Sequence, residues 1–321
     1  MTDEAAHVES LSDDIIAIDT LTGGMTNVTA GYLIPAPRPA LIECGPSLSS
    51  ENVIAGLRAV GLDQEDLAYL IVTHIHLDHA GGAGDVATAF ASARVVVSEI
   101  GAPHLRDPQR LNASSRRVYG ELMDTVYGDC TPVERERLVA AGDGDHVDLG
   151  DGRRLELLST PGHAKHHIGI WDEATGTIFS GDSVGVKLPG MRTLRPATPP
   201  PDFHLEAATR SLGRYLEREP TRIYLAHYGE IGPPREALES AVERLHVWAE
   251  TAEAAYREHD ELDHVAETLA QRFADEFDSA LIPDDPHGKD RVRLMSGIRS
   301  NAAGLLRYLR RRDAGELTSV G

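Results

Sequence analysis

The sequence predicts an α/β protein that continues into an all-helical C-terminal part. Through about the first two-thirds of the 321 residues, short apolar runs alternate with turns and amphipathic helices. The run at residues 67–73 is almost continuously apolar, as in a strand buried on both faces, and it leads into a histidine cluster. From residue 233 onward only helical periodicity remains. We therefore expect a catalytic domain over residues 1–232 and a helical extension over residues 233–321.

Each expected strand of the catalytic domain is rich in apolar or β-branched residues and is bounded by turn residues. The expected strands are residues 14–20, 27–34, 40–44, 67–73, 94–98, 146–149, 153–159, 168–172, 177–180 and 222–226. Between them we expect helices over residues 49–60, 82–92 and 203–218, a helical insert over residues 101–141, and a proline-rich loop over residues 187–201. In the extension, apolar residues at helical spacing predict helices over residues 233–259, 261–279 and 289–312, with a break at residues 283–286.

Composition and charge exclude several classes of partner. The formal net charge of −20, from 51 acidic and 31 basic residues, repels phosphate backbones and argues against a nucleic-acid partner. The sequence has no apolar run of about 18 residues, so we expect no membrane span. The acidic N-terminus lacks the basic and apolar regions of a signal peptide, and Cys44 and Cys130 are too few for a disulfide framework. We expect a cytoplasmic protein with a small-molecule substrate; the number of subunits stays open.

The first candidate ligands for a metal form one short motif. His74, His76, Asp78 and His79 lie within six residues, directly after the expected buried strand at residues 67–73. The carboxyl ends of strands are where sites form in open α/β sheets. Alternation along an extended segment would direct His74 and His76 to the same side, and the following turn can direct Asp78 and His79 to a neighbouring point. The spacing therefore predicts two adjacent metal centres.

Three further side chains repeat this placement. His163 follows the expected strand at residues 153–159, Asp182 follows residues 177–180, and His227 follows residues 222–226. Each lies beside a Gly or Pro turn, and ligands are commonly held on loops that rigid strands position. Histidine and aspartate in this joint pattern indicate a metal site far more strongly than the first motif alone.

Four short motifs carry a family resemblance: THIHLDHAGG at residues 73–82, TPGH at 160–163, SGD at 180–182 and AHYG at 226–229. In this order they resemble the metallo-β-lactamase superfamily, in particular its glyoxalase-II-like and general hydrolase branch. The resemblance covers about residues 10–230 and implies a four-layer αββα sandwich. It also implies a set of seven metal ligands. His74, His76 and His163 would bind one metal ion, Asp78, His79 and His227 a second, and Asp182 would bridge both.

The resemblance implies a dinuclear metal-dependent hydrolase, with Asp78 and Asp182 taking part in catalysis. Two divalent metal ions are expected; zinc suits imidazole and carboxylate ligands, and iron or manganese are the alternatives. A water molecule shared by two such ions has its pKa lowered toward about 7, and the resulting metal-bound hydroxide would attack a small ester or thioester. Two other functions fit the same ligands: a non-heme iron oxidoreductase resembling sulfur dioxygenases, and a metal-retaining sensor or binding module.

Departures from the family pattern narrow the range of possible substrates. Glu43 stands where the strand before the first helix usually ends in Asp, which predicts a different contact to the ligands there. Ser183, and not a tyrosine, follows Asp182, which disfavours the lactone-hydrolysing branch. The bridging aspartate motif disfavours antibiotic hydrolysis, and no basic residues match those that bind glutathione. His167 is expected to orient a ligand, and His204 lies at the start of a helix that can approach the site mouth.

Overall fold

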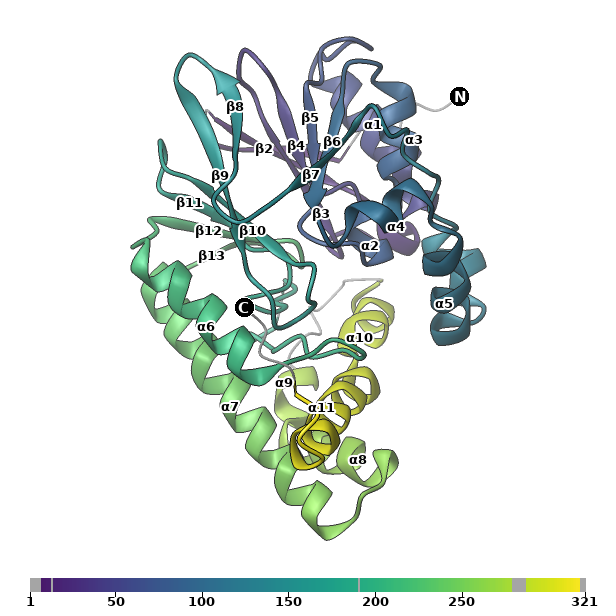
Figure 1. The fold of residues 1–321 in the computed structure, drawn as a ribbon, viewed down its shortest axis with the longest axis vertical. Coiled ribbons are helices and arrows are strands. Elements are labelled where there is room, and N and C mark those ends of the chain that lie inside the picture. Colours follow the sequence, from purple (N-terminus) through teal and green to yellow (C-terminus); the bar gives the residue numbers. More distant parts are fainter. Residues whose placement is uncertain (1–6, 13, 190, 279–286, 318–321) are drawn as a thin grey trace. The chain divides into compact units, whose positions relative to one another are not determined.

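The computed structural model describes residues 7–12, 14–189, 191–278 and 287–317, and Figure 1 shows their fold. These residues form a seven-stranded sheet, a six-stranded sheet and a set of helices, which confirms the predicted α/β class with two sheets. Among them, no helix is both long enough and apolar enough to cross a membrane. The cytoplasmic location stays a prediction.

The seven-stranded sheet follows the order of the chain. Its strands are β1 (Val8–Ser12), β2 (Ile15–Asp19), β3 (Ala30–Ile34), β4 (Ala40–Ile42), β5 (Tyr69–Ile71), β6 (Arg94–Ser98) and β7 (Leu138–Ala141). Strands β1 to β4 pair antiparallel, and β4 to β7 pair parallel. The strands at the centre are the most deeply buried: Leu41, Leu70 and Val95 have no exposed surface. This burial explains the continuous apolar run that precedes the histidine motif.

Helical crossovers join the parallel strands, as parallel pairing requires. They comprise α1 (Ser50–Ala59) after β4, α2 (Leu77–Ala80) and α3 (Ala83–Ala89) after β5, and α4 (Ala102–Arg106), α5 (Gln109–Tyr119) and the π-helical turn η3 (Met123–Tyr127) after β6. The single turns η1 (Thr22–Gly24) and η2 (Ser47–Ser49) complete this part. The predicted helical insert at residues 101–141 is confirmed for the helices, but its last residues form β7.

The six-stranded sheet has the order β13–β12–β11–β10–β9–β8. Its strands are β8 (His146–Gly150), β9 (Arg153–Ser159), β10 (Ile168–Asp172), β11 (Thr177–Phe179), β12 (Arg222–Leu225) and β13 (Gly229–Ile231). Strands β11 and β12 are parallel, and α6 (Leu205–Glu217) connects them. The unpredicted strands β1 and β13 are short, partly exposed and without an apolar run, whereas β7 is a short apolar run that lies inside the segment expected to be helical.

The C-terminal helices are α7 (Pro234–Glu258), α8 (Leu262–Arg272), α9 (Ala274–Asp278), α10 (Gly288–Ser296) and α11 (Ile298–Asp313). Helices α6, α7, α8 and α11 pack together (Figure 1), and Trp248, Leu269 and Leu305 are fully buried among them. This confirms the amphipathic helices expected after residue 233.

Two expected helices are interrupted. The helix expected over residues 289–312 breaks at Gly297, whose φ of 53° is left-handed and ends α10. The helix expected over residues 261–279 breaks at Phe273, whose ring stacks on Trp248 with a centroid distance of 4.7 Å. Residue 279 and the break expected at residues 283–286 lie outside the described residues.

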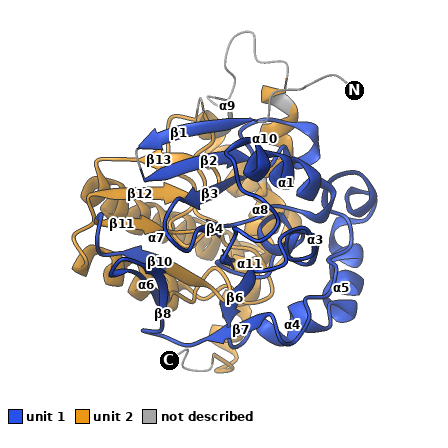
Figure 2. Ribbon diagram, turned by 90° about the horizontal axis from the view of Figure 1, so that it is seen from above, with its two compact units in different colours: residues 1–158, 170–175 blue, residues 159–169, 176–321 orange. Residues whose placement is uncertain are grey.

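The chain divides into two compact units, coloured in Figure 2: residues 1–158 with 170–175, and residues 159–169 with 176–321. The predicted ligands are distributed over both. His74, His76, Asp78 and His79 belong to the first unit, and we call them the first ligand group. His163, Asp182 and His227 belong to the second unit, and we call them the second ligand group. The predicted boundary at residue 232 stays a prediction.

Candidate metal centre

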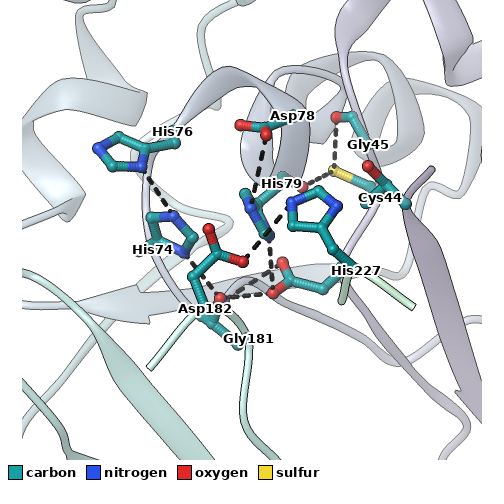
Figure 3. A network of polar contacts seen from close by, with 12 residues as sticks. Cys44, Gly45, His74, His76, Asp78, His79, Gly181, Asp182 and His227 are labelled. Atoms are coloured by element: carbon teal, nitrogen blue, oxygen red, sulfur yellow. Dashed lines mark hydrogen bonds and ion pairs between the residues drawn. The ribbon is translucent and has the colours of Figure 1, made fainter. Parts of the chain in front are cut away.

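The first ligand group follows β5 at its carboxyl end, on the loop and on the short helix α2 (Figure 3). His74 and His79 are completely buried, and their ring centroids are 4.1 Å apart. Nε2 of His74 lies 2.9 Å from Nδ1 of His76, so these two nitrogens face each other. Asp78 Oδ2 lies 3.8 Å from Nε2 of His79, and the Asp78 side chain is 17% exposed. The structure thus brings all four predicted ligands of this motif together.

Glu43 lies on the Nδ1 side of the imidazole rings of His74 and His79. It follows β4, has a left-handed φ of 65°, and is 1% exposed. Its carboxylate accepts a short hydrogen bond from the Thr73 hydroxyl and lies 3.3 Å from Nδ1 of His79. The Thr73 hydroxyl oxygen in turn lies 2.9 Å from Nδ1 of His74. One buried carboxylate therefore reaches both histidines, directly and through Thr73.

These contacts fix the tautomer of both rings. A carboxylate only accepts, so the contact with His79 requires a proton on Nδ1 of that ring. The Thr73 hydroxyl gives its own proton to Glu43, so its oxygen accepts from Nδ1–H of His74. In the neutral form of both rings, Nε2 then carries the lone pair that a cation could bind. Although the Glu43 carboxylate lies near both rings, it contacts the Nδ1 edge of His79, and we assign it to orientation and not to metal binding.

A test of this assignment is Glu43→Gln. The Thr73 hydroxyl and Nδ1 of His79 contact the same oxygen, Oε1, so glutamine would offer them either a neutral amide oxygen, which accepts more weakly than a carboxylate, or an N–H group, and the anchoring of both imidazoles would weaken. We expect metal affinity to fall about 10- to 100-fold, the usual cost of removing such a partner. Chelator competition would measure it. Glu206→Gln is the control, since the Glu206 carboxylate accepts a hydrogen bond from the Tyr308 hydroxyl and belongs to neither ligand group. Unchanged affinity in Glu43→Gln would contradict the orienting role.

The second ligand group is arranged around one carboxylate. Asp182 follows β11 and is 8% exposed. Its Oδ2 lies 3.6 Å from Nε2 of His163, and its Oδ1 lies 3.5 Å from Nε2 of His227. His227, which follows β12, is completely buried (Figure 3). Each oxygen of Asp182 therefore faces a different imidazole, as a carboxylate that bridges two cations would need.

The chemistry of these donors fits a divalent cation. Nδ1 of His163 donates to the carbonyl oxygen of Ala197 at 3.1 Å, because a carbonyl can only accept. The proton on Nδ1 leaves a lone pair on Nε2, which faces the Asp182 carboxylate. Two acceptors at this separation repel one another unless a positive charge lies between them. A cation bound by both removes that repulsion, and imidazole with carboxylate is a donor set that zinc prefers.

Two other histidines have defined roles. Nε2 of His167 accepts a hydrogen bond of 3.2 Å from the backbone N–H of Asp182, which is a contact that could orient this predicted ligand. His204 precedes α6, and its Nδ1 accepts from the backbone N–H of Ala207 at 3.4 Å, which makes it a helix cap. Two threonines that contact these histidines were not predicted: Thr73, whose hydroxyl lies 2.9 Å from Nδ1 of His74, and Thr160, whose hydroxyl lies 2.8 Å from Nδ1 of His167. Each is the first residue of its motif, THIH or TPGH, and this shared position is the signal that could have identified them.

Comparison with known proteins supports the family resemblance. The sequence profile of the metallo-beta-lactamase superfamily matches residues 26–227, a range that includes all seven predicted ligands. The metallo-beta-lactamase fold-containing protein ST1585 of Sulfurisphaera tokodaii is 30% identical over 220 residues, which span 65% of this chain and 80% of that protein. A probable metallo-hydrolase of Bacillus subtilis, YqjP, is 22% identical over 258 residues, 73% of this chain and 76% of that protein.

Solved structures show the same fold. The structure of the archaeal superfamily protein ST1585 has a TM-score of 0.61 and 25% identity, covering 87% of this chain and 93% of that one. A beta-lactamase domain protein from Burkholderia ambifaria has a TM-score of 0.63 at 18% identity and covers 98% of this chain and 90% of that one. These likenesses confirm the expected fold class, an α/β fold with two sheets and helices. The chain belongs to the metallo-β-lactamase superfamily.

Proposed function

We propose that this protein is a dinuclear metal-dependent hydrolase that acts on a small ester or thioester. The two ligand groups would together hold two divalent ions, zinc in the first place. The observation that carries the proposal is the Asp182 carboxylate, each oxygen of which faces a different imidazole at 3.5 to 3.6 Å. A buried acid with this double approach has the shape of a bridging ligand.

Different residues of the chain would contribute different parts of the mechanism. Bound divalent ions supply Lewis acidity and make water acidic enough to attack at neutral pH. Glu43 and Thr73 hold the Nδ1 edges of His79 and His74, so that Nε2 of each ring faces another predicted ligand, Asp78 or His76. Asp78, with a side chain 17% exposed, is accessible enough for its carboxylate to accept a hydrogen bond from the attacking water and orient it. Asp182 is buried and supplies negative charge that offsets the cations.

Named relatives support hydrolysis of an acyl bond. Hydroxyacylglutathione hydrolase of Hahella chejuensis is 29% identical over 130 residues, 40% of this chain and 38% of that protein. N-acyl homoserine lactonase of Bacillus cereus is 28% identical over 123 residues, 38% of this chain and 40% of that protein. Both names denote hydrolases, and both matches cover only a minority of either chain. We therefore extend the bond class, an ester or thioester, to this protein and not the individual substrates.

Metal content tests the proposal against its alternatives. Protein purified without added metal should contain about two ions per chain, predominantly zinc, by elemental analysis. It should then hydrolyse short-chain aryl esters or thioesters, with rates followed by chromophore release. Iron as the native metal, together with oxygen consumption in the presence of a low-molecular-weight persulfide, would favour the oxidoreductase. Two bound ions without turnover of any ester or thioester in the panel would contradict the proposal and favour a sensor or binding module.

A further inference from the structure

Helix α6 fastens the loop that carries His163. The Ser211 hydroxyl donates to the Pro161 carbonyl oxygen at 2.7 Å. Arg214 Nη1 donates to the Ser159 carbonyl oxygen at 2.6 Å. Both donors lie on α6, and both acceptors lie on the segment just before His163. The position of this ligand is therefore set by a helix about 50 residues further along the chain.

Tyr215, on the same helix, reaches two segments at once. Its hydroxyl lies 2.9 Å from Ser183 Oγ and 3.5 Å from Thr160 Oγ1, and the whole residue is buried. The one proton of the Tyr215 hydroxyl can go either to Ser183, whose own proton goes to the Ser180 carbonyl oxygen at 2.7 Å, or to Thr160. A Cβ at Gly169 would lie 2.0 Å from the tyrosine oxygen, so only glycine there admits the hydroxyl.

The contacts continue from Thr160 to Asp182. Nδ1 of His167 lies 2.8 Å from Thr160 Oγ1, and Nε2 of the same ring accepts from the backbone N–H of Asp182 at 3.2 Å. Because Nε2 accepts, the ring proton lies on Nδ1 and is donated to Thr160. His167 and Thr160 are no more than 1% exposed, so water does not compete for these bonds.

We infer that Tyr215 is a positioning residue that fixes the separation of His163 and Asp182. Its hydroxyl contacts Ser183, in the turn that follows Asp182, and Thr160, in the loop that precedes His163. It therefore connects the two segments that carry these ligands. The inference rests on the proposed function, because it is the metal-binding role of both ligands that gives their separation importance. A purely structural role predicts a different result, because a phenylalanine ring keeps the packing of the ring and only leaves the place of the hydroxyl beside Gly169 empty, which costs stability and not zinc affinity.

The test removes only that hydroxyl. In Tyr215→Phe we expect zinc affinity, measured by competition with a chromophoric chelator, to fall about tenfold, at the lower end for groups that orient ligands. We expect kcat to fall with it at saturating zinc, while KM stays unchanged because no substrate contact is lost. Tyr308→Phe is the matched control, since that buried hydroxyl donates to Glu206 at 2.6 Å and touches no ligand. It should lose some thermal stability and keep its zinc affinity.

Substitutions at Thr160 and His167 test the same series of contacts. Thr160→Val breaks the same link from its other end, and His167→Gln keeps an acceptor that can reach the Asp182 N–H. Thr160→Val should weaken zinc binding as Tyr215→Phe does, and their combination should add little. His167→Gln should bind zinc more tightly than His167→Leu. Equal zinc affinity in wild type, Tyr215→Phe and Thr160→Val would overturn the inference, and so would additive losses. If Tyr215→Phe does not fold, Ser183→Ala, which removes the other partner of the tyrosine hydroxyl and leaves the bond between His167 and Thr160 intact, decides by the same criterion.

Zinc affinity is measured without substrate. A protein that binds zinc but hydrolyses no ester or thioester would therefore contradict the proposed function and leave the positioning role supported or overturned on its own data.

Discussion

Stripping the metal ions should abolish hydrolysis, and zinc should restore it. Without cations, the Nε2 lone pair of His163 faces the Asp182 carboxylate, and nothing in this arrangement can make water acidic enough to attack at neutral pH. Incubation with dipicolinate followed by gel filtration should leave below about 1% of the starting rate, because removing both ions removes the whole source of activation. Stoichiometric zinc should return it.

Stability should change in parallel. A ligand present at about 1,000 times its dissociation constant stabilises the folded state by about 4 kcal/mol, so loss of the ions should lower the melting temperature by about 10 °C. Dipicolinate already saturated with zinc is the control for effects of the chelator itself. Full activity in protein shown by elemental analysis to be metal-free would contradict the metal-dependent mechanism.

The positions of the predicted ligands could be read from the sequence because each one follows a strand; their role as ligands stays a prediction. His74 comes after β5, Asp182 after β11 and His227 after β12, and each strand is short, apolar and bounded by turn residues. The pattern that identifies such a strand also identifies its carboxyl end, where the ligand lies. The same local logic failed for β7, whose partly exposed residues show no alternation, and for the helix that Gly297 divides.

The sequence predicted an orienting role for His167 and a different contact at Glu43, but it could not reveal the partners of Glu43 and Tyr215, because these are distant in the sequence. Glu43 is 30 residues from Thr73 and 36 from His79, and its role depends on a left-handed backbone conformation that no local pattern signals in glutamate. Tyr215 is 55 residues from Thr160. On α6 it has the spacing of an ordinary core residue, and only the tertiary structure shows that its hydroxyl has partners. Side-chain periodicity reports which face is buried, but it does not report what a buried polar atom contacts.

Replacing Asp182 by asparagine should reduce activity and metal occupancy together while the fold persists. The amide keeps one acceptor oxygen but replaces the other with an N–H group, which donates and cannot bind a cation. One of the two imidazoles would then face a donor in place of a ligand. Since partners that only orient ligands already contribute about 10- to 100-fold, we expect the loss in kcat/KM to exceed about 100-fold. Elemental analysis should show about one ion per chain in place of two.

The same substitution should affect the metal-free protein differently. In that state asparagine removes a buried negative charge and offers its N–H to a neighbouring Nε2 lone pair, so the melting temperature should stay equal to that of metal-free wild type or rise. The rise in melting temperature on adding zinc should shrink. Asp202→Asn, an aspartate 3.7 Å from Lys165 and outside both ligand groups, should behave as wild type throughout. Two ions per chain with undiminished turnover in Asp182→Asn would show that this carboxylate does not bridge the metals.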